Sequence, residues 1–236
     1  MRRDRRRGFR GYGPAGIVTP SFVPSDLATL RGWYKGDTGF VAGTSWADQS
    51  GVGNNVTLAS GVTAGAALNG HQTASFDGTS NAYGYLAAFD LGAADHAFMA
   101  VVVKVTSAVA EHTIIGLDDG AFNVESVYTK SSSGNVTAYD FLGDVVVGGS
   151  VTGAWHRVAY AVNKAASSTL YVDNTSQGSA TNNSNLANPS PLCIGFRAAV
   201  GIFMLGQIAE IVILNATPSA GDRTSLDTYF TTRYGI

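Results

Sequence analysis

Phe98-Met99-Ala100-Val101-Val102-Val103-Lys104-Val105 is an almost unbroken run of apolar residues, and it decides the fold class of this chain. A run of this kind fits a central β-strand that is buried on both faces, because a strand with one wet face would alternate apolar and polar residues. We therefore expect a strand at 98–105, with a second sheet against one face and covering loops against the other.

Short apolar or alternating runs, each bounded by turn residues, surround this segment. Their regular spacing favours two packed antiparallel sheets over alternating β and α units. The polar stretch 174–191, rich in Ser, Thr and Asn, predicts a loop. We expect further strands at 30–35, 73–76, 112–117, 122–128, 136–142, 144–147, 155–162, 170–173, 192–196 and 207–214.

The C-terminal segment departs from this β pattern. Ser219 is suited to cap a helix, and Gly235 is suited to end it. Leu226, Tyr229 and Phe230 fall at positions i, i+3 and i+4 and form one apolar face. The pattern predicts a short helix that packs on the sandwich and holds the C-terminus.

Composition excludes several classes of protein. The chain has 236 residues, 45% hydrophobic and 14% charged, so a sizeable core is expected rather than disorder. Cys193 is the single cysteine, which excludes an intrachain disulfide. No apolar run approaches the length of a membrane span or follows the basic N-terminus as in a signal peptide. We expect synthesis in the cytoplasm and no membrane contact.

The charge is distributed unevenly. Residues 1–10 hold six Arg and one Asp, a charge of +5, whereas the whole chain carries −2, so the remainder carries −7. We expect 1–25 to form a basic arm containing Gly and Pro, and 26–236 to form one domain. Clustered Arg side chains pair with carboxylates or phosphates, although such a block also occurs as a solubilising tail. The candidate partner-binding residues are Arg2, Arg3, Arg5, Arg6, Arg7 and Arg10.

Four segments spread over about residues 26–236 form a recognisable ordered set. They are Asp26-Leu27-x-x-Leu30-x-x-Trp33-Tyr34, Trp46-Ala47-Asp48-Gln49-Ser50-Gly51-x-Gly53-Asn54-Asn55, Asn69-Gly70-His71-x-x-x-x-Phe76-Asp77-Gly78 and Gly206-Gln207-Ile208-Ala209-Glu210-Ile211-x-Ile213-x-Asn215. Together they resemble the concanavalin A-like, laminin-G-like domains that are common in phage structural proteins and bacterial surface proteins. The resemblance implies an all-β, concanavalin A-like jelly-roll β-sandwich, with a short C-terminal helix and an extended N-terminal arm.

Most of the signature residues suit structural roles. Trp46 is a large amphipathic side chain for the edge of a core. Asp48 is expected to accept hydrogen bonds from nearby backbone amides, and Asp77-Gly78 is a tight-turn pair. Where members of the family place an acidic residue soon after the first-strand tryptophan, this chain has Lys35 first and Asp37 later.

Glu210 is the most informative of the signature residues. In a regular strand it would share a face with Ile208 and Val212, so it would point toward apolar surroundings. A buried carboxylate must find partners or become protonated, and Arg157, Arg223 or a backbone turn are candidates. The alternative interpretation is a catalytic acid with a raised pKa.

Enzymatic motifs are missing from the sequence. Glycosidases need two carboxylates a few ångströms apart, and no Glu-x-Asp-x-Glu strand occurs. Nucleophile-elbow, zinc-protease and P-loop motifs are also missing, and the histidines show no metal spacing. We expect no catalytic residues, no metal and no cofactor. Calcium is the alternative, through loop oxygens of Asp48, Asn54, Asp77, Asp118 and Asp119.

Three functional hypotheses follow. The first is a non-enzymatic bacteriophage virion protein, in a decoration, head-fibre or tail position. It would form homo-oligomers in the particle, dock onto other virion proteins through the arm, and face host polysaccharide. The second is a stand-alone carbohydrate-binding module of a bacterial surface protein, for which Tyr83 and Tyr85, or Tyr128 and Tyr139, are candidates for stacking on sugar rings. The third is a nucleic-acid binder acting through the arm alone.

Overall fold

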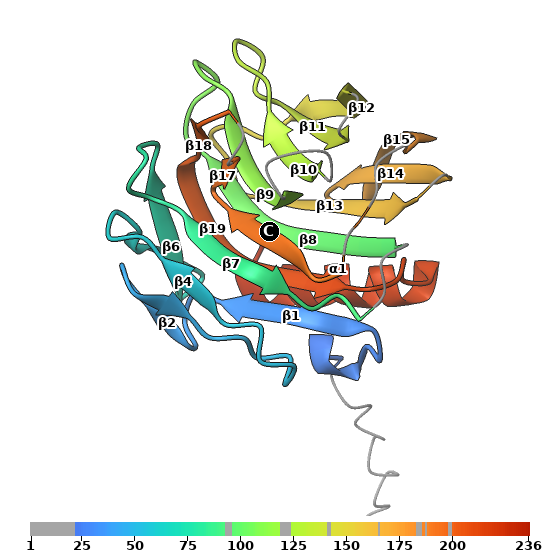
Figure 1. Ribbon diagram of the computed structural model, residues 1–236, viewed down its shortest axis with the longest axis horizontal. Coiled ribbons are helices and arrows are strands. Elements are labelled where there is room, and N and C mark those ends of the chain that lie inside the picture. The colour runs from blue at the N-terminus through green and yellow to red at the C-terminus, as the bar shows by residue number, and fades with distance from the viewer. Residues whose placement is uncertain are drawn as a thin grey trace, which may run out of the picture.

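The computed structural model describes residues 22–92, 96–118, 124–140, 143–164, 166–182, 186, 188–197 and 200–236. Two antiparallel sheets face each other, and one helix lies outside them (Figure 1). The fold is thus the predicted all-β sandwich with a C-terminal helix. The six arginines of the predicted arm, and Asp119, lie outside the described residues, and the domain boundary at residue 26 stays a prediction.

Sheet A contains eight of the strands in the described residues. Its order is β15-β14-β13-β8-β19-β6-β5, and β1 also pairs with β19. The strands are β1 (Leu30–Lys35), β5 (Thr63–Leu68), β6 (His71–Asp77), β8 (His96–Val105), β13 (His156–Asn163), β14 (Ser167–Val172), β15 (Thr175–Thr181) and β19 (Leu205–Leu214).

Sheet B contains nine strands of the described chain, in the order β12-β11-β10-β9-β16-β7-β4-β3-β2. They are β2 (Phe40–Val41), β3 (Ser45–Trp46), β4 (Val56–Leu58), β7 (Gly84–Phe89), β9 (His112–Asp118), β10 (Val124–Thr129), β11 (Asn135–Asp140), β12 (Gly143–Ser150) and β16 (Ser190–Ile194). A separate hairpin joins β17 (Phe196–Arg197) to β18 (Ile202–Phe203), and a 3₁₀ turn, η1 (Pro24–Asp26), precedes β1.

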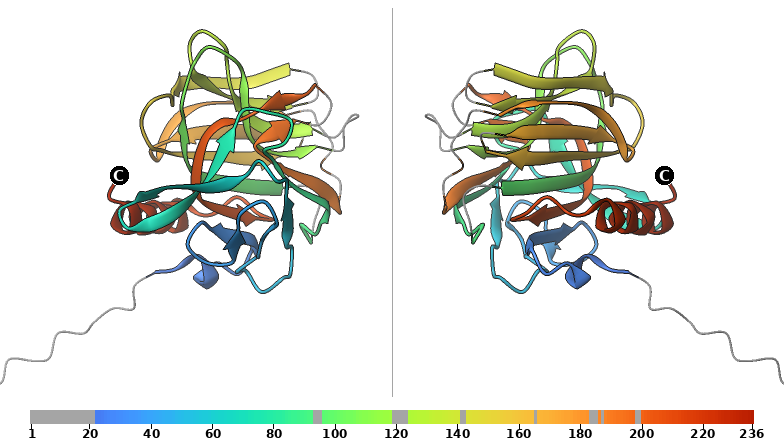
Figure 2. Two further views of the ribbon diagram at one scale, coloured as in Figure 1. Left: turned by 90° about the vertical axis from the view of Figure 1, so that its left-hand side faces the viewer. Right: turned by 90° about the vertical axis from the view of Figure 1, so that its right-hand side faces the viewer.

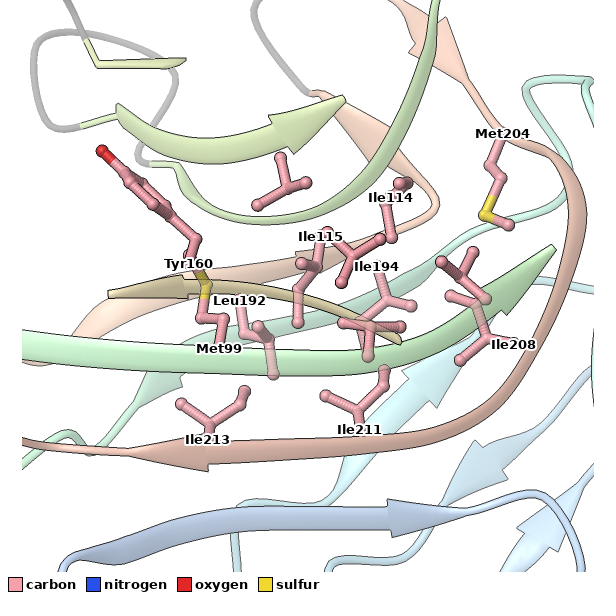
Figure 3. Packing of buried hydrophobic residues seen from close by; sticks show 14 of the residues in the cluster. Met99, Ile114, Ile115, Tyr160, Leu192, Ile194, Met204, Ile208, Ile211 and Ile213 are labelled. Atoms are coloured by element: carbon pink, nitrogen blue, oxygen red, sulfur yellow. The ribbon is translucent and has the colours of Figure 1, made fainter. Parts of the chain in front are cut away.

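The main core fills the space between the two sheets. Figure 3 shows Met99, Ile211 and Ile213, from the central strands β8 and β19, beside Ile115 and Leu192 from β9 and β16. All five side chains are fully buried. The apolar run at 98–105 is therefore a central strand of sheet A, as the sequence predicts.

The second face of β8 is covered by a helix, and this corrects the expectation of covering loops. Phe98 and Val102 point away from the main core and pack with Leu226 and Phe230 of α1 (Ala220–Tyr234). Figure 2 shows α1 along the outside of the sandwich with the C-terminus beside it. An unbroken apolar strand therefore lies between a sheet and a helix, both of which exclude water from it.

The ends of α1 agree with the predicted capping. The Ser219 hydroxyl accepts a hydrogen bond from the backbone N–H of Asp222 over 3.1 Å, and Gly235 ends the helix at φ +70°. The buried helix positions are Leu226, Phe230 and Tyr234, spaced four residues apart. This spacing forms one stripe, so α1 lies flat along sheet A.

Several strands differ from the sequence prediction. β15 lies inside the predicted loop 174–191, and β4, β5 and β7 lie where no strand was expected. Most of these strands are rich in Gly, Ala, Ser or Thr and have many exposed positions. Such segments carry little apolar alternation, so hydrogen-bond pairing with a neighbouring strand decides their conformation.

We predict that Phe230→Ala lowers the free energy of unfolding by about 3–5 kcal/mol, because it leaves a cavity between α1 and β8. Urea unfolding followed by circular dichroism measures the change. Thr228→Ala, at an exposed position of the same helix, should change the stability by less than about 0.5 kcal/mol. A similar small effect of Phe230→Ala would contradict the assignment of α1 to the core.

Candidate ligand-binding sites

Four donors converge on the carboxylate of Glu210, which is fully buried beneath α1. Trp33 Nε1, from β1, donates to Oε1 over 2.5 Å, and the Tyr229 hydroxyl donates to the same oxygen over 3.0 Å. The Tyr234 hydroxyl donates to Oε2 over 2.6 Å, and Arg233 Nε lies 3.3 Å from it. Burial raises the pKa of Glu210, and these hydrogen bonds with the Arg233 charge oppose the rise.

A β-bulge gives Glu210 its direction and corrects the predicted alternation. The pairing of β19 with β8 shifts register between Ile208 and Glu210, so Ala209 is an extra residue. Ile208 therefore packs in the main core, whereas Ala209 and Val212 pack on the helix side. Glu210 contacts α1 and does not share the face of Ile208.

The cation beside this carboxylate is Arg233, which the sequence analysis did not propose. Arg157 Nε instead lies 2.7 Å from an Asp227 carboxylate oxygen. Arg223 Nε donates to Asn174 over 3.1 Å. Arg233 reaches β19 because α1 folds back over sheet A, and this contact leaves no signal in local sequence.

Arg233 also holds Asp37, the acidic residue just after β1. Its Nη2 lies 2.8 and 2.6 Å from the two carboxylate oxygens of Asp37, and His71 Nδ1 lies 2.6 Å from one of them. Partial burial alone would raise the pKa of Asp37, but the hydrogen bond with His71 and the charge of Arg233 lower it overall. These contacts fasten the turn after β1 to the end of α1.

Asp48 organises the loop between β3 and β4. Its Oδ1 accepts from the backbone N–H groups of Trp33 and Ser50, each over 2.9 Å. Its Oδ2 accepts from the N–H groups of Gly53 and Asn54 over 3.1 and 3.0 Å, and Gly53 adopts φ +92°. The predicted interaction of Asp48 with backbone amides is confirmed. Because both oxygens face N–H donors, the carboxylate is arranged to hold the loop rather than a cation.

The other signature residues also have structural contacts. Trp46 is fully buried, and its Nε1 donates to the carbonyl of Lys35 over 2.9 Å. Asp77 Oδ1 accepts from the N–H of Thr79 over 2.9 Å, and Gly78 adopts φ +80°. The Asp77-Gly78 pair therefore forms a turn at the end of β6.

An aromatic cluster lies on the outer side of sheet B, and we name it the tyrosine patch: Tyr83, Tyr85, Phe196 and Phe203. The Phe196 ring centroid lies 4.6 Å from that of Tyr83, 6.0 Å from that of Tyr85 and 6.4 Å from that of Phe203. Tyr85 is 36% exposed, more than any other aromatic side chain in the part of the chain that the structure describes. The hairpin β17–β18 thus supports an exposed tyrosine ring.

The second pair of sequence candidates is more enclosed. Tyr128 is 9% exposed, and its hydroxyl donates to Asp144 over 2.5 Å. The Arg197 guanidinium lies 4.0 Å from the ring centroid of Tyr139 and covers that ring. The structure therefore places Tyr85 in a better position to contact a ligand than Tyr128 or Tyr139.

Glu125 is another buried carboxyl, which sequence reasoning missed. It lies beside Asp140 across the β10–β11 pair, and Asn182 Nδ2 lies 2.8 Å from its Oε2 and 3.0 Å from the Tyr160 hydroxyl. Burial raises the pKa of Glu125, and the hydrogen bonds from Asn182 and Tyr160 offset only part of the rise. The pKa is about 8 with all of these effects included. The strand alternation with buried Val127 could have indicated this inward direction.

The described residues form no group of three or more His, Cys, Asp or Glu side chains suited to a metal ion. His71 contacts Asp37, and His156 contacts Asp173. The expectation that the protein needs no metal or cofactor stays a prediction. No helix in the described part of the chain is long and apolar enough to cross a membrane.

Comparisons with known proteins identify the fold. No protein-family model and no curated protein sequence matches the chain. The binding domain of Paraclostridial Mosquitocidal Protein 1 is similar, with a TM-score of 0.66 and 14% identity over 88% of this chain and 53% of that one. Domain 4 of AbnA, a GH43 extracellular arabinanase from Geobacillus stearothermophilus, was determined in complex with arabinotriose. It has a TM-score of 0.67 and 15% identity over 84% of this chain and 98% of that one.

Trypanosoma rangeli sialidase, in complex with 2,3-difluoro-KDN, has a TM-score of 0.68 and 13% identity over 91% of this chain and 35% of that one. This chain thus spans about half of the mosquitocidal-protein chain and a third of the sialidase chain. Identities this low show the fold alone. The fold class is an all-β sandwich shared with binding domains and with parts of glycosidases, and membership of the concanavalin A-like family stays a prediction.

We predict that Asp37→Asn destabilises the protein at neutral pH but not in strong acid. A carboxyl whose pKa is lowered by folding stabilises the native state above its unfolded pKa, about 4, and loses that contribution as the pH falls through the folded pKa. Thermal unfolding should show a lower Tm for the variant at pH 7, and a difference that disappears near about pH 2. Glu111→Gln, at an exposed carboxylate, is the control. A difference that persists in acid would contradict the role of the Asp37 charge.

Proposed function

We propose that this chain is a non-enzymatic glycan-binding domain, and that the tyrosine patch contacts the sugar. The observation that carries the proposal is the exposed ring of Tyr85, supported by the Phe196 ring. An aromatic ring has a large apolar face and, in tyrosine, a polar hydroxyl. A sugar ring has matching apolar C–H faces and polar hydroxyl groups.

The local backbone favours a rigid site. Tyr85 follows Gly84, where an added Cβ would lie 3.0 Å from a Val56 methyl carbon and 3.1 Å from one of Leu58. Gly84 therefore leaves room for these core side chains beneath β7, while the Phe196 ring packs against Tyr85 on the outer face. A ring that is fixed before binding loses little conformational entropy when a ligand arrives.

The similar structures support the same class of ligand. Domain 4 of AbnA, matched over 98% of its length, was determined with arabinotriose, and the sialidase, matched over 35% of its length, was determined with 2,3-difluoro-KDN. These ligands make arabinotriose and sialic acid the first probes for this chain.

The two buried glutamates support a binding role rather than catalysis. A glycosidase acid must reach the glycosidic oxygen of its substrate. Glu210 and Glu125 are each at most 1% exposed. Glu210 lies beneath α1, on the sheet opposite the tyrosine patch, so neither acid is available to a sugar at Tyr85.

We predict that Tyr85→Ala weakens glycan binding roughly tenfold, since an aromatic contact contributes about 0.5–1.5 kcal/mol beyond its buried area. An array of immobilised neutral and sialylated glycans, with arabinotriose included, measures the change. Tyr85→Phe keeps the ring and should retain most of the affinity, and Val109→Ala in an exposed loop is the control. A wild-type chain that binds no glycan would refute the proposed function.

We further propose that the domain is a bacteriophage virion component, with several copies held in the particle by the arginine-rich residues 1–10. The sequence supports this with an arm of charge +5 before a body of charge −7. Arginine pairs bidentately with carboxylates, so an acidic surface of a neighbouring virion protein is a suitable partner. An arm that binds nucleic acid is the alternative, and the acidic body disfavours extended contact with DNA.

Deletion of residues 1–12 should leave a folded domain that no longer joins the particle, because the described contacts of the sandwich begin at Phe22. Circular dichroism checks folding, and mass spectrometry of purified particles checks incorporation. Normal incorporation of the truncated chain would contradict the anchoring role. DNA binding that falls steeply with salt, and disappears with the arm, would favour the nucleic-acid alternative instead.

A further inference from the structure

A cleft of about 460 Å³ lies beside α1, which packs on sheet A, whereas the tyrosine patch lies on sheet B. One wall is the outer side of α1, and the other is the β5–β6 hairpin at Asn69 and His71. Phe22, which leads into η1, also lines it. Ligand pockets in proteins commonly measure about 300–1,000 Å³, so the cleft has the volume of a small-molecule site.

The helix wall presents a row of hydroxyl groups. Thr224, Thr228 and Thr232 follow one another at intervals of four residues, so they lie on the same side of α1. The Thr224 and Thr228 hydroxyls donate to the carbonyls of Ala220 and Thr224 over 2.9 and 2.8 Å. With their protons engaged, these two oxygens keep lone pairs that accept hydrogen bonds from a ligand.

The charges beside the cleft already neutralise one another. Arg233 pairs with Asp37 and with Glu210, and His71 also contacts Asp37. An ionic ligand would therefore have to compete with existing ion pairs for Arg233. An uncharged ligand that carries its own hydroxyl donors avoids this competition.

Two aromatic side chains complete the cleft. Phe22 and Tyr229 both line it and both pack, partly buried, against the helix-side cluster. The Tyr229 hydroxyl is directed to Glu210, so its ring is held at the cleft. Aromatic faces next to hydroxyl acceptors suit a ligand with apolar faces and a polar rim.

We propose that this cleft is a second saccharide subsite, which binds an uncharged sugar unit. The proposal rests on the glycan-binding function proposed above and names a second location and a ligand class. An oligosaccharide matches this lining, because its hydroxyl groups can donate to the Thr224 and Thr228 oxygens while its apolar ring faces lie against Phe22 or Tyr229. An acidic sugar is disfavoured by the paired state of Arg233.

Thr228→Trp tests the proposal, because an indole at this exposed helix position fills the cleft without entering the core. The full chain is assayed on the same glycan array with neutral oligosaccharides and sialylated glycans, and Kd values for arabinotriose are measured by calorimetry. Because the tyrosine patch lies elsewhere and can still bind sugar, the substitution is also made in the Tyr85→Ala variant, where it should weaken binding to neutral glycans about tenfold, equivalent to about 1.4 kcal/mol. Val109→Trp places the same side chain on an 87% exposed loop position that does not line the cleft, and it should leave binding unchanged. Unchanged Tm values show that both variants fold.

The outcomes separate the two proposals. If the wild-type chain binds neutral glycans, Tyr85→Ala weakens binding and adding Thr228→Trp to that variant weakens it no further, the cleft proposal is wrong and the proposed function stands. If Thr228→Trp lost binding to sialylated glycans alone and kept binding to neutral ones, the assignment of an uncharged ligand would be overturned. A wild-type chain that binds no glycan refutes both. Thr228→Val, which removes the hydroxyl but keeps the volume, should weaken binding less than Thr228→Trp.

Discussion

Beneath α1, the carboxylate of Glu210 receives hydrogen bonds from a strand near the N-terminus and from the last helix of the chain. Leaving it without these donors would place an unsatisfied carboxylate in an apolar layer, which is costly. β1, β19 and α1 are therefore held in one arrangement. Arg233 contacts Glu210 and also Asp37, which in turn contacts His71 at the wall of the cleft. The buried carboxylate and this wall are therefore joined through Arg233.

The apolar strands β8 and β19 explain why the molecule has three layers. Each needs a cover on both faces, and sheet B supplies one while α1 supplies the other. The tyrosine patch lies over sheet B and the cleft lies beside α1, so the two proposed sugar contacts are on opposite sides of the sandwich and cannot act on the same ring.

Sequence reasoning predicted the strands that have an apolar pattern of their own, such as β1 and β8, and the helix with its Ser219 cap. It missed β5 (Thr-Ala-Gly-Ala-Ala-Leu) and β15 (Thr-Ser-Gln-Gly-Ser-Ala-Thr), whose conformation depends on a neighbouring strand. Tyr85 was found as a candidate, but its support by Phe196 joins residues 111 positions apart, which no local pattern reveals. The bulge at Ala209 turned Glu210 toward Arg233, because one added residue reverses the direction of every following side chain.

Cys193 points to the outer face of sheet B, as the cross-strand neighbour of Tyr85 and Gly116, yet it is fully buried. It is the single cysteine of the sequence. Modification by a thiol reagent therefore requires a local opening that uncovers this face, and the labelling rate reports how often that opening occurs. The labelling rate of Cys193 therefore measures local opening of sheet B next to the tyrosine patch.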